Sequence, residues 1–308
     1  MSEKSLTLAN INRCNIPKGN VGMELEIESK YRLPDIIGWN IHQEGSLRGD
    51  YACEYVSYEP FKYSVYKEHL NILLSSLSKF RKHIDENSIR TSFHVHFNVC
   101  NSTPVEIWTT AVLYWLLETP MMQYCGPSRQ GNRFCLRLKD AEAILRVASA
   151  DLLNDLHMSR PFTAFRNNIR YGAMNLSSIN KFGSLEFRGM RGTLDYDILI
   201  NWMTGLERIV EQKVFTSPSE VLNYYINKGA QALLDKVFDN HFFNKYINTA
   251  KNYDKEILLS AGLLTDIAYI HDWKEYEESI NKTYSKQKKE EKFLLDIEEA
   301  RRIINEVE

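Results

Sequence analysis

Acidic, imidazole and guanidinium side chains recur at every second position in three segments of the chain. This spacing places side chains on one face of a β-strand. In segments 21–28, 92–99 and 184–188 the alternate residues are apolar, so each is predicted to be a strand with one core face and one polar face. The chemistry-bearing residues of the polar faces are Glu24, Glu26, Glu28, His94, His96, Glu186 and Arg188. A shorter candidate strand, 52–57, carries Glu54.

These polar faces differ from an ordinary solvated sheet face, where Thr, Lys, Ser and Gln are mixed. Carboxylates on neighbouring positions repel one another, so such a face is stable mainly when cations lie among them. Oxygen ligands predominate over imidazole and no thiolate is in register, which favours Mg²⁺ or Mn²⁺ over structural zinc. The sequence therefore predicts a divalent-metal site on the sheet.

Each of these motifs also has an ordinary explanation when it is taken alone. Two glutamates two residues apart suit an exposed edge strand, and a His-x-His pair suits a buried polar pair. A Glu-x-Arg pair suits a surface ion pair. It is their recurrence in one chain that favours the metal site.

Magnesium and manganese ions in proteins usually serve phosphates, and guanidinium groups match phosphate oxygens bidentately. The candidate phosphate partners are Arg170, Arg188 and Arg191, with simple surface charge as the alternative for Arg170. The chain has no Walker-type or Rossmann glycine motif, so a nucleotide would have to be held by metal and arginine. It also has no G-x-S-x-G elbow and no evident Cys-His pair, so covalent catalysis by the protein is not expected.

Helices are predicted around these strands. Apolar residues at helical spacing mark segments 70–84, 105–118, 141–156 and 199–210. In the segment Ser217-Pro218-Ser219-Glu220, a capping-box pattern is combined with proline at the first helical position, so a new helix should begin there.

We place a domain boundary at this point, between a catalytic domain of residues 1–216 and a helical C-terminal extension of residues 217–308. The extension ends in a Lys/Glu-rich helix with an apolar stripe and a charged run, residues 286–292, that is most simply a solvated face. The stripe consists of Phe293, Leu294, Ile297, Ala300, Ile303, Ile304 and Val307.

Composition argues against several broad classes of function. The 308 residues are 44% hydrophobic and 25% charged, which is typical of a globular protein. A formal net charge of −2 argues against nucleic acid or an anionic membrane as a partner. The five cysteines never form a C-x-x-C motif and are expected to be reduced thiols. Without a signal-peptide pattern or a membrane-length apolar run, we expect a soluble, cytoplasmic protein.

The order of the motifs resembles the amidoligase family, a branch of the glutamine-synthetase-like carboxylate-amine ligases that is often found in phage genomes. The resemblance covers roughly residues 22–211. The motifs in order are G-M-E-L-E-I-E, E-G-S-L-R-G-D-Y-A-C-E-Y-V-S, S-F-H-V-H-F-N, R-Q-G-N-R-F-C, R-Y-G-A-M-N-L and S-L-E-F-R-G-M-R-G-T-L-D. Each motif is loose by itself, but six in this order are specific.

The resemblance implies an antiparallel glutamine-synthetase-like sheet curved around ATP and two or more divalent ions. With the predicted flanking helices and the helical C-terminal extension, the expected fold class is α+β. The γ-phosphate passes to a substrate carboxylate, and an amine then displaces the phosphate. Either substrate could belong to a protein or peptide, and a glutamine amidotransferase could supply ammonia. A phage-encoded member would act in the host cytoplasm.

The resemblance also assigns residues. The metal-binding positions are matched by Glu24, Glu26, Glu54, His94 and Glu186. His96 matches the second histidine of the H-x-H strand, near the nucleotide. Arg188, Arg170 and Arg191 match the arginines that steady phosphate, and Glu186 with Arg188 is expected to stabilise phosphoryl transfer.

The chain departs from the family pattern at two places. Glu44-Gly45-Ser46 replaces an acidic D-G-S, and Ser92-Phe93 replaces the glycine before the H-x-H strand. The family-motif residues Arg129, Asn132, Arg133 and Cys135 have no role that the sequence reveals, although packing suits Cys135 better than catalysis.

Two other functions remain open at this point. A cupin-like metal enzyme would use the H-x-H pair and a glutamate to hold iron or manganese. A non-catalytic binding protein would keep the fold without turnover.

Overall fold

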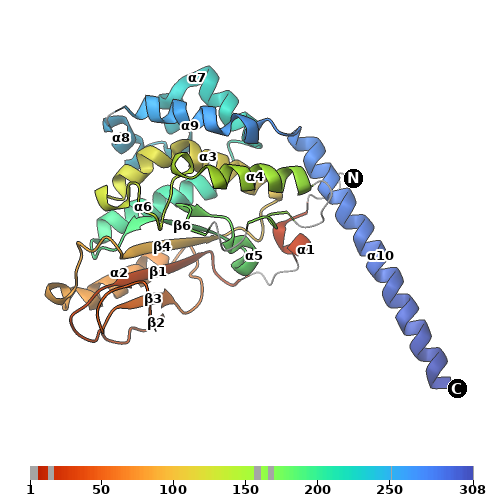
Figure 1. Ribbon diagram of the computed structural model, residues 1–308, viewed down its shortest axis with the longest axis horizontal. Helices are drawn as coiled ribbons and strands as arrows, with labels where there is room; N and C mark the ends of the chain where they lie inside the picture. The colour runs from red at the N-terminus through yellow and green to blue at the C-terminus, as the bar shows by residue number, and fades with distance from the viewer. Residues whose placement is uncertain (1–5, 13–16, 156–160, 166–169, 251, 308) are drawn as a thin grey trace.

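The computed structural model describes residues 6–12, 17–155, 161–165, 170–250 and 252–307. Within these residues the fold is α+β, with one six-stranded antiparallel sheet in the order β2-β3-β1-β4-β6-β5. Figure 1 shows the sheet as one layer, with helices stacked above it. The strands are β1 (Val21–Ile27), β2 (Trp39–Gln43), β3 (Cys53–Ser57), β4 (Ser92–Asn98), β5 (Met174–Asn175) and β6 (Ser184–Arg191).

The alternating residues of β1 place it at the centre of the sheet. Its odd-numbered residues, Val21 to Ile27, are at most 2% exposed. On its other face Glu24 pairs with His94 of β4, and Gly22 pairs with His96. The four predicted strands are confirmed, and β6 continues to Arg191. The short β2 and β5 were not predicted, because five and two residues at the edges of the sheet carry little alternation.

A β-bulge interrupts the pairing of β4 with β6. Phe93 pairs with Met190 but Val95 pairs with Phe187, so His94 faces two residues of β6, Arg188 and Gly189. A bulge bends its strand and re-aims a side chain. The change in register was not apparent from the alternation of residues 184–188.

The core face of the sheet is covered by α3 (Pro104–Tyr124) and α6 (Tyr196–Val210). Thr103 caps α3 in a full capping box with Glu106, and Pro104 occupies the first helical position. Tyr114 of α3 contacts Phe187 of β6, with ring centroids 4.9 Å apart. Residues 104–122 of α3 are buried apart from Glu106, because α7 and α9 cover its other side.

Helix α2 (Tyr66–Ser78) ends earlier than its predicted bound of residue 84. A 3-10 turn follows at Arg81–His83, and Ile84 is extended and bridges to Ser29 beyond the end of β1. Ile84 therefore pairs with the segment that follows β1 and is not part of the helix. The remaining N-terminal helices are α1 (Leu8–Asn12), α4 (Glu142–Asp155), which confirms the predicted helix 141–156, and α5 (Ser178–Phe182).

The C-terminal region is helical, as predicted, with α7 (Pro218–Phe238), α8 (Phe242–Thr249), α9 (Tyr253–Ala268) and α10 (Trp273–Val307). Ser217 caps α7, but the Glu220 carboxylate accepts from Thr216 and not from Ser217, so the capping box is incomplete. One hydrophobic core includes residues of α3, α7 and α9. The division at residue 216 stays a prediction.

The last part of α10 projects from the rest of the molecule, and Phe293 and Leu294 are exposed. No described helix combines the length and apolar character that a membrane span requires. None of the four described cysteines forms a disulfide, and all are buried; Cys14 lies outside the described residues.

Candidate active site

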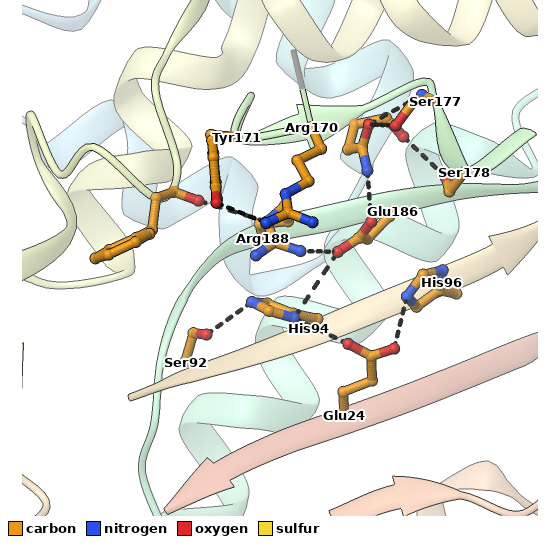
Figure 2. A network of polar contacts seen from close by, with 12 residues as sticks. Glu24, Ser92, His94, His96, Arg170, Tyr171, Ser177, Ser178, Glu186 and Arg188 are labelled. Carbon is orange, nitrogen blue, oxygen red and sulfur yellow. Dashed lines mark hydrogen bonds and ion pairs between the residues drawn. The ribbon is translucent and has the colours of Figure 1, made fainter. Parts of the chain in front are cut away.

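The centre of the polar face is the carboxylate of Glu24, which lies between the two imidazoles of β4 (Figure 2). Its Oε2 is 3.0 Å from His94 Nδ1, and its Oε1 is 3.2 Å from His96 Nε2. Both histidines come from alternate positions of one strand, and Glu24 lies on the strand beside it. The period of two in both strands therefore builds this arrangement directly.

Glu186 lies on the other side of His96, its direct cross-strand neighbour. One carboxylate oxygen, Oε1, pairs with the Arg188 guanidinium and lies 3.8 Å from His94 Nδ1. The other oxygen accepts a 2.6 Å hydrogen bond from the Asn175 amide on β5. Glu186 therefore connects the arginine of its own strand to the histidines of β4.

Two sets of possible metal ligands result, and they share Glu24. In each set, one ligand atom per residue lies within 4.8 Å of the others. One set is Glu24, His96 and Glu186; the other is Glu24, Glu54 and His94. Two carboxylates and one imidazole suit a hard divalent cation with open positions for other ligands.

His96 provides an independent test of this interpretation. Its Nε2 is buried and makes no hydrogen bond, although it lies 3.2 Å from Glu24. A buried nitrogen without a partner is costly, and a cation between Glu24, His96 and Glu186 would satisfy it. The residues present therefore fit a metal ion.

The charges at the site depend on these contacts. Burial disfavours ionisation of Glu24, but the neighbouring imidazoles of His94 and His96 hold its pKa well below the usual value. Burial likewise opposes charge on Glu186, but His96 and Arg188 lower its pKa. For Glu54, burial and the neighbouring Glu24 and Glu26 raise the pKa to about 8. Among Glu24, Glu54 and Glu186 it is Glu54 whose pKa is raised, and a bound cation would lower it again.

A cavity of about 200 Å³ opens beside the two ligand sets. Carboxylates and arginines both line it, with two aromatic rings between them. Its lining includes Glu24, Glu26, Glu44, Glu54, His94, Arg90, Arg170, Arg188, Phe134 and Tyr171. This combination can hold cations and anionic groups next to one another.

A second cavity, of about 190 Å³, lies on the His96 side of the site and also reaches Glu24. Gly22 of β1 forms part of its lining, and Tyr58 and Phe182 contribute aromatic rings that are 75% and 50% exposed. It is less polar than the first cavity, which suits the less charged part of a ligand.

Residues 40–210 match the model of a family described as "Putative amidoligase enzyme". The chain belongs to this family. A comparison with curated proteins found no match. The family match includes β4 and β6 but not β1, so Glu24 and Glu26 lie outside the matched residues.

Most of the residues that sequence analysis assigned to the site of this amidoligase do meet there. The ligand sets contain Glu24, Glu54, His94 and Glu186, and they add His96, which was expected near nucleotide. Arg188 and Arg170 line the first cavity. Arg170 is exposed, and its guanidinium donates to the Tyr171 hydroxyl at 2.7 Å and lies over the Tyr171 ring.

Two assigned residues of the amidoligase make contacts other than the predicted ones. Glu26 lines the first cavity but belongs to neither ligand set; it accepts from the Ser92 hydroxyl, which lies 2.7 Å from His94 Nε2. The Arg191 guanidinium donates to the carbonyls of Tyr124 and Cys125 at the end of α3, outside the cavity lining. Metal ligation by Glu26 and phosphate binding by Arg191 stay predictions, and these contacts give them no support.

Sequence analysis missed Arg90 and Asn175. The Arg90 guanidinium lines the first cavity and donates to the Ser46 carbonyl at 2.6 Å. No strand pattern reveals it, because it precedes β4 in an irregular segment. Asn175 lies in the motif R-Y-G-A-M-N-L, so its position in the family pattern was the available signal.

Proposed function

We propose that this amidoligase uses ATP and divalent metal ions, Mg²⁺ or Mn²⁺, to join a carboxylate to an amine through an acyl phosphate. The observation that carries the proposal is the pair of ligand sets that share Glu24, beside Arg188 and a cavity lined with both charges. We also propose that the antiparallel sheet is of the glutamine-synthetase type.

In this proposal Glu24 would contribute a ligand to each of two cation sites, one with His94 and Glu54 and the other with His96 and Glu186. Divalent ions held by these residues would supply positive charge to neutralise the phosphate groups of ATP. The residues on the sheet fix where these charges lie before substrate arrives, so little reorganisation is needed during the reaction.

Arg188 is assigned to the transferred phosphoryl group. Its fork of N–H donors suits phosphate oxygens, and its contact with Glu186 holds it beside the ligand sets. Arg90 and Arg170, in the same cavity, are suited to the remaining phosphate or substrate charge. The chain needs no strong base, because a carboxylate is already a nucleophile at neutral pH.

The bond changes balance without a further reagent. A carboxylate oxygen of the substrate attacks the γ-phosphorus, and ADP leaves with the electron pair of the broken P–O bond. An amine nitrogen then attacks the acyl carbon, the C–O bond to phosphate breaks, and the amine loses a proton. A glutamine amidotransferase remains a proposed source of ammonia, and the chemical class of the amine is not specified by the site.

The arrangement of the histidines favours this function over a cupin-like one. A cupin-like site would place both imidazoles of the H-x-H pair on one ion. Here His94 and His96 belong to different ligand sets, and Glu24 lies between them. A binding protein that keeps the fold is the remaining alternative, and turnover distinguishes it.

Hydroxylamine trapping tests the proposal. An acyl phosphate is an activated acyl group, and hydroxylamine is small enough to capture it without a dedicated amine pocket. The full chain, Mg²⁺, ATP and a panel of carboxylates should give a hydroxamate with at least one carboxylate, together with ADP. A cupin-like enzyme would give no ATP-dependent hydroxamate, and a binding protein would give no ADP.

A further inference from the structure

One arginine of the motif R-Q-G-N-R-F-C is buried beneath the site. Arg129 is 1% exposed, and its guanidinium donates to two consecutive carbonyls of β6: Nε to Gly189 at 3.1 Å and Nη2 to Arg188 at 2.8 Å. These are the two residues that face His94 at the β-bulge.

Arg129 supplies hydrogen-bond donors to backbone carbonyls that the bulge leaves without regular partners. An extra residue in one strand is left unpaired, so its backbone groups lose regular partners in the ladder. Buried carbonyls must nevertheless accept hydrogen bonds. A guanidinium is suited to this position, because one planar group can reach two neighbouring carbonyls. We propose that Arg129 is a positioning residue that fixes the bulge and so aims the Arg188 side chain at Glu186.

The surrounding segment forms one hydrogen-bonded unit with Arg129. Cys135 donates from its amide to the Asn132 carbonyl and from its thiol to the Arg129 carbonyl. The Asn132 side chain accepts from the Phe134 amide at 3.0 Å. The Phe134 carbonyl in turn accepts from Arg188 Nε at 3.4 Å. The segment thus contacts the backbone of Arg188 through Arg129 and its side chain through Phe134.

Close packing at Gly189 makes the bulge sensitive to its support. A Cβ added at Gly189 would lie 2.4 Å from the sulfur of Met122 on α3, so this strand approaches the helix more closely than a side chain allows. If Arg129 were removed, the carbonyls of Arg188 and Gly189 would lose their donors. The strand could not shift toward α3 to find new ones, because it already packs closely against Met122. We expect it to change register instead, which would turn Arg188 away from the cavity.

The inference rests on the proposed function only because it treats Arg188 as a functional residue. Its test therefore follows the NMR signal of the Arg188 side chain in the absence of ATP. In the full chain labelled with ¹⁵N-arginine, the Nε–H signal of Arg188 is assigned by its absence from Arg188→Lys. Arg129→Met should shift or broaden this signal and speed its exchange with water on the order of tenfold, because the hydrogen bond to the Phe134 carbonyl would be weakened. A second reading, binding of Mg²⁺-ATP, should weaken by a similar factor.

The matched control is Leu233→Ala, which creates a cavity in α7 on the far side of α3 and lowers stability without touching β6. It should leave the Arg188 signal unchanged. If Arg129→Met shows the same unchanged signal at a similar loss of melting temperature, Arg129 is only a structural residue and the inference is wrong.

Arg129→Lys keeps the test decisive if the methionine variant does not fold. Lysine retains the charge but cannot bond both carbonyls in the fixed geometry of the guanidinium. The Arg188 signal should therefore still change, and a wild-type signal in Arg129→Lys would overturn the inference. Failure of the wild-type chain to bind Mg²⁺-ATP, with the Arg188 signal behaving as expected, would overturn the proposed function alone.

Discussion

Carboxyl groups are buried in two regions of this molecule, and they behave in opposite ways. Glu118 of α3 is 2% exposed, and burial raises its pKa to about 8. Glu186 of β6 is 5% exposed, yet its pKa is lowered. The difference lies in the partners. One oxygen of Glu118 accepts from the Leu138 amide and the other has no hydrogen bond, whereas Glu186 has Arg188, Asn175 and an imidazole.

Glu118 and Glu186 show that burial alone does not decide the charge of a carboxyl group. Burial raises the pKa of Glu118, while an imidazole and Arg188 beside Glu186 lower its pKa in spite of burial. The polar face of the sheet keeps the carboxylates of Glu24 and Glu186 charged, with Arg188 and the imidazoles of His94 and His96 beside them. Charged carboxylates gathered in this way are suited to holding a divalent ion.

The largest expected effect comes from removing the ligand that both sets share. Glu24→Gln keeps the shape of the side chain but loses the charge, so both cation sites should weaken together. Loss of even an outer partner of a metal ligand costs about 10–100-fold in affinity. We therefore expect binding of Mn²⁺, measured by electron paramagnetic resonance, to weaken more than about 100-fold, with no ATP-dependent turnover.

Glu278→Gln, an exposed substitution on α10, is the control and should bind Mn²⁺ as the wild type does. Glu186→Gln should lose turnover while keeping the cation site formed by Glu24, Glu54 and His94. Two Mn²⁺ ions bound to folded Glu24→Gln with unchanged affinity would contradict the proposed role of Glu24 in both cation sites.

A smaller effect is expected from changing the arginine beside the cluster. Arg188→Lys keeps a positive charge near Glu186 but removes the bidentate fork. Loss of one well-placed donor to transition-state charge costs on the order of 100-fold in rate. Hydroxamate formation should fall by about this factor while Mn²⁺ binding changes little. Equal losses of binding and rate would show that Arg188 serves the metal site and not phosphoryl transfer.

Much of the site could be predicted from the sequence, because a period of two makes the geometry of a strand almost independent of its surroundings. Alternation alone placed Glu24, His94, His96 and Glu186 on polar faces, and antiparallel pairing brought those faces together. It could not assign His96 to a ligand set with Glu186, because that depends on the register between β4 and β6.

Other features depend on contacts that no local pattern encodes. The bulge at Gly189 depends on packing against α3 and on Arg129, which lies 60 residues earlier in the chain. Arg90 reaches the cavity from an irregular segment. Helix α2 ends early because Ile84 bridges to Ser29, a tertiary contact that overrides the helical spacing.

The smallest expected effect is the pH dependence of stability that Glu118 of α3 contributes. Folded Glu118 has a pKa of about 8 against an ordinary value of 4.5, so the folded state binds this proton more tightly than the unfolded state does. Wild-type stability should therefore fall as pH rises from about 4.5 to about 8. Glu118→Gln lacks this proton equilibrium and should gain melting temperature relative to wild type across the same window.

Thermal melts of both proteins from pH 5 to pH 9 measure how this difference in melting temperature changes with pH. Parallel curves would show that Glu118 is charged at neutral pH in the folded protein, and the contrast with Glu186 would then fail.

We propose that the carboxylates and imidazoles of the sheet bind nucleotide through divalent metal. Thermal melting of the full chain tests it directly, with Mg²⁺ alone, with ATP in EDTA, and with both. A ligand at about 100 times its dissociation constant stabilises the folded state by roughly 2.7 kcal/mol. If nucleotide binds through the metal ions, the melting temperature should rise clearly only with Mg²⁺ and ATP together. Glu24→Gln should show no such rise. An equal rise with ATP in EDTA would contradict the proposal.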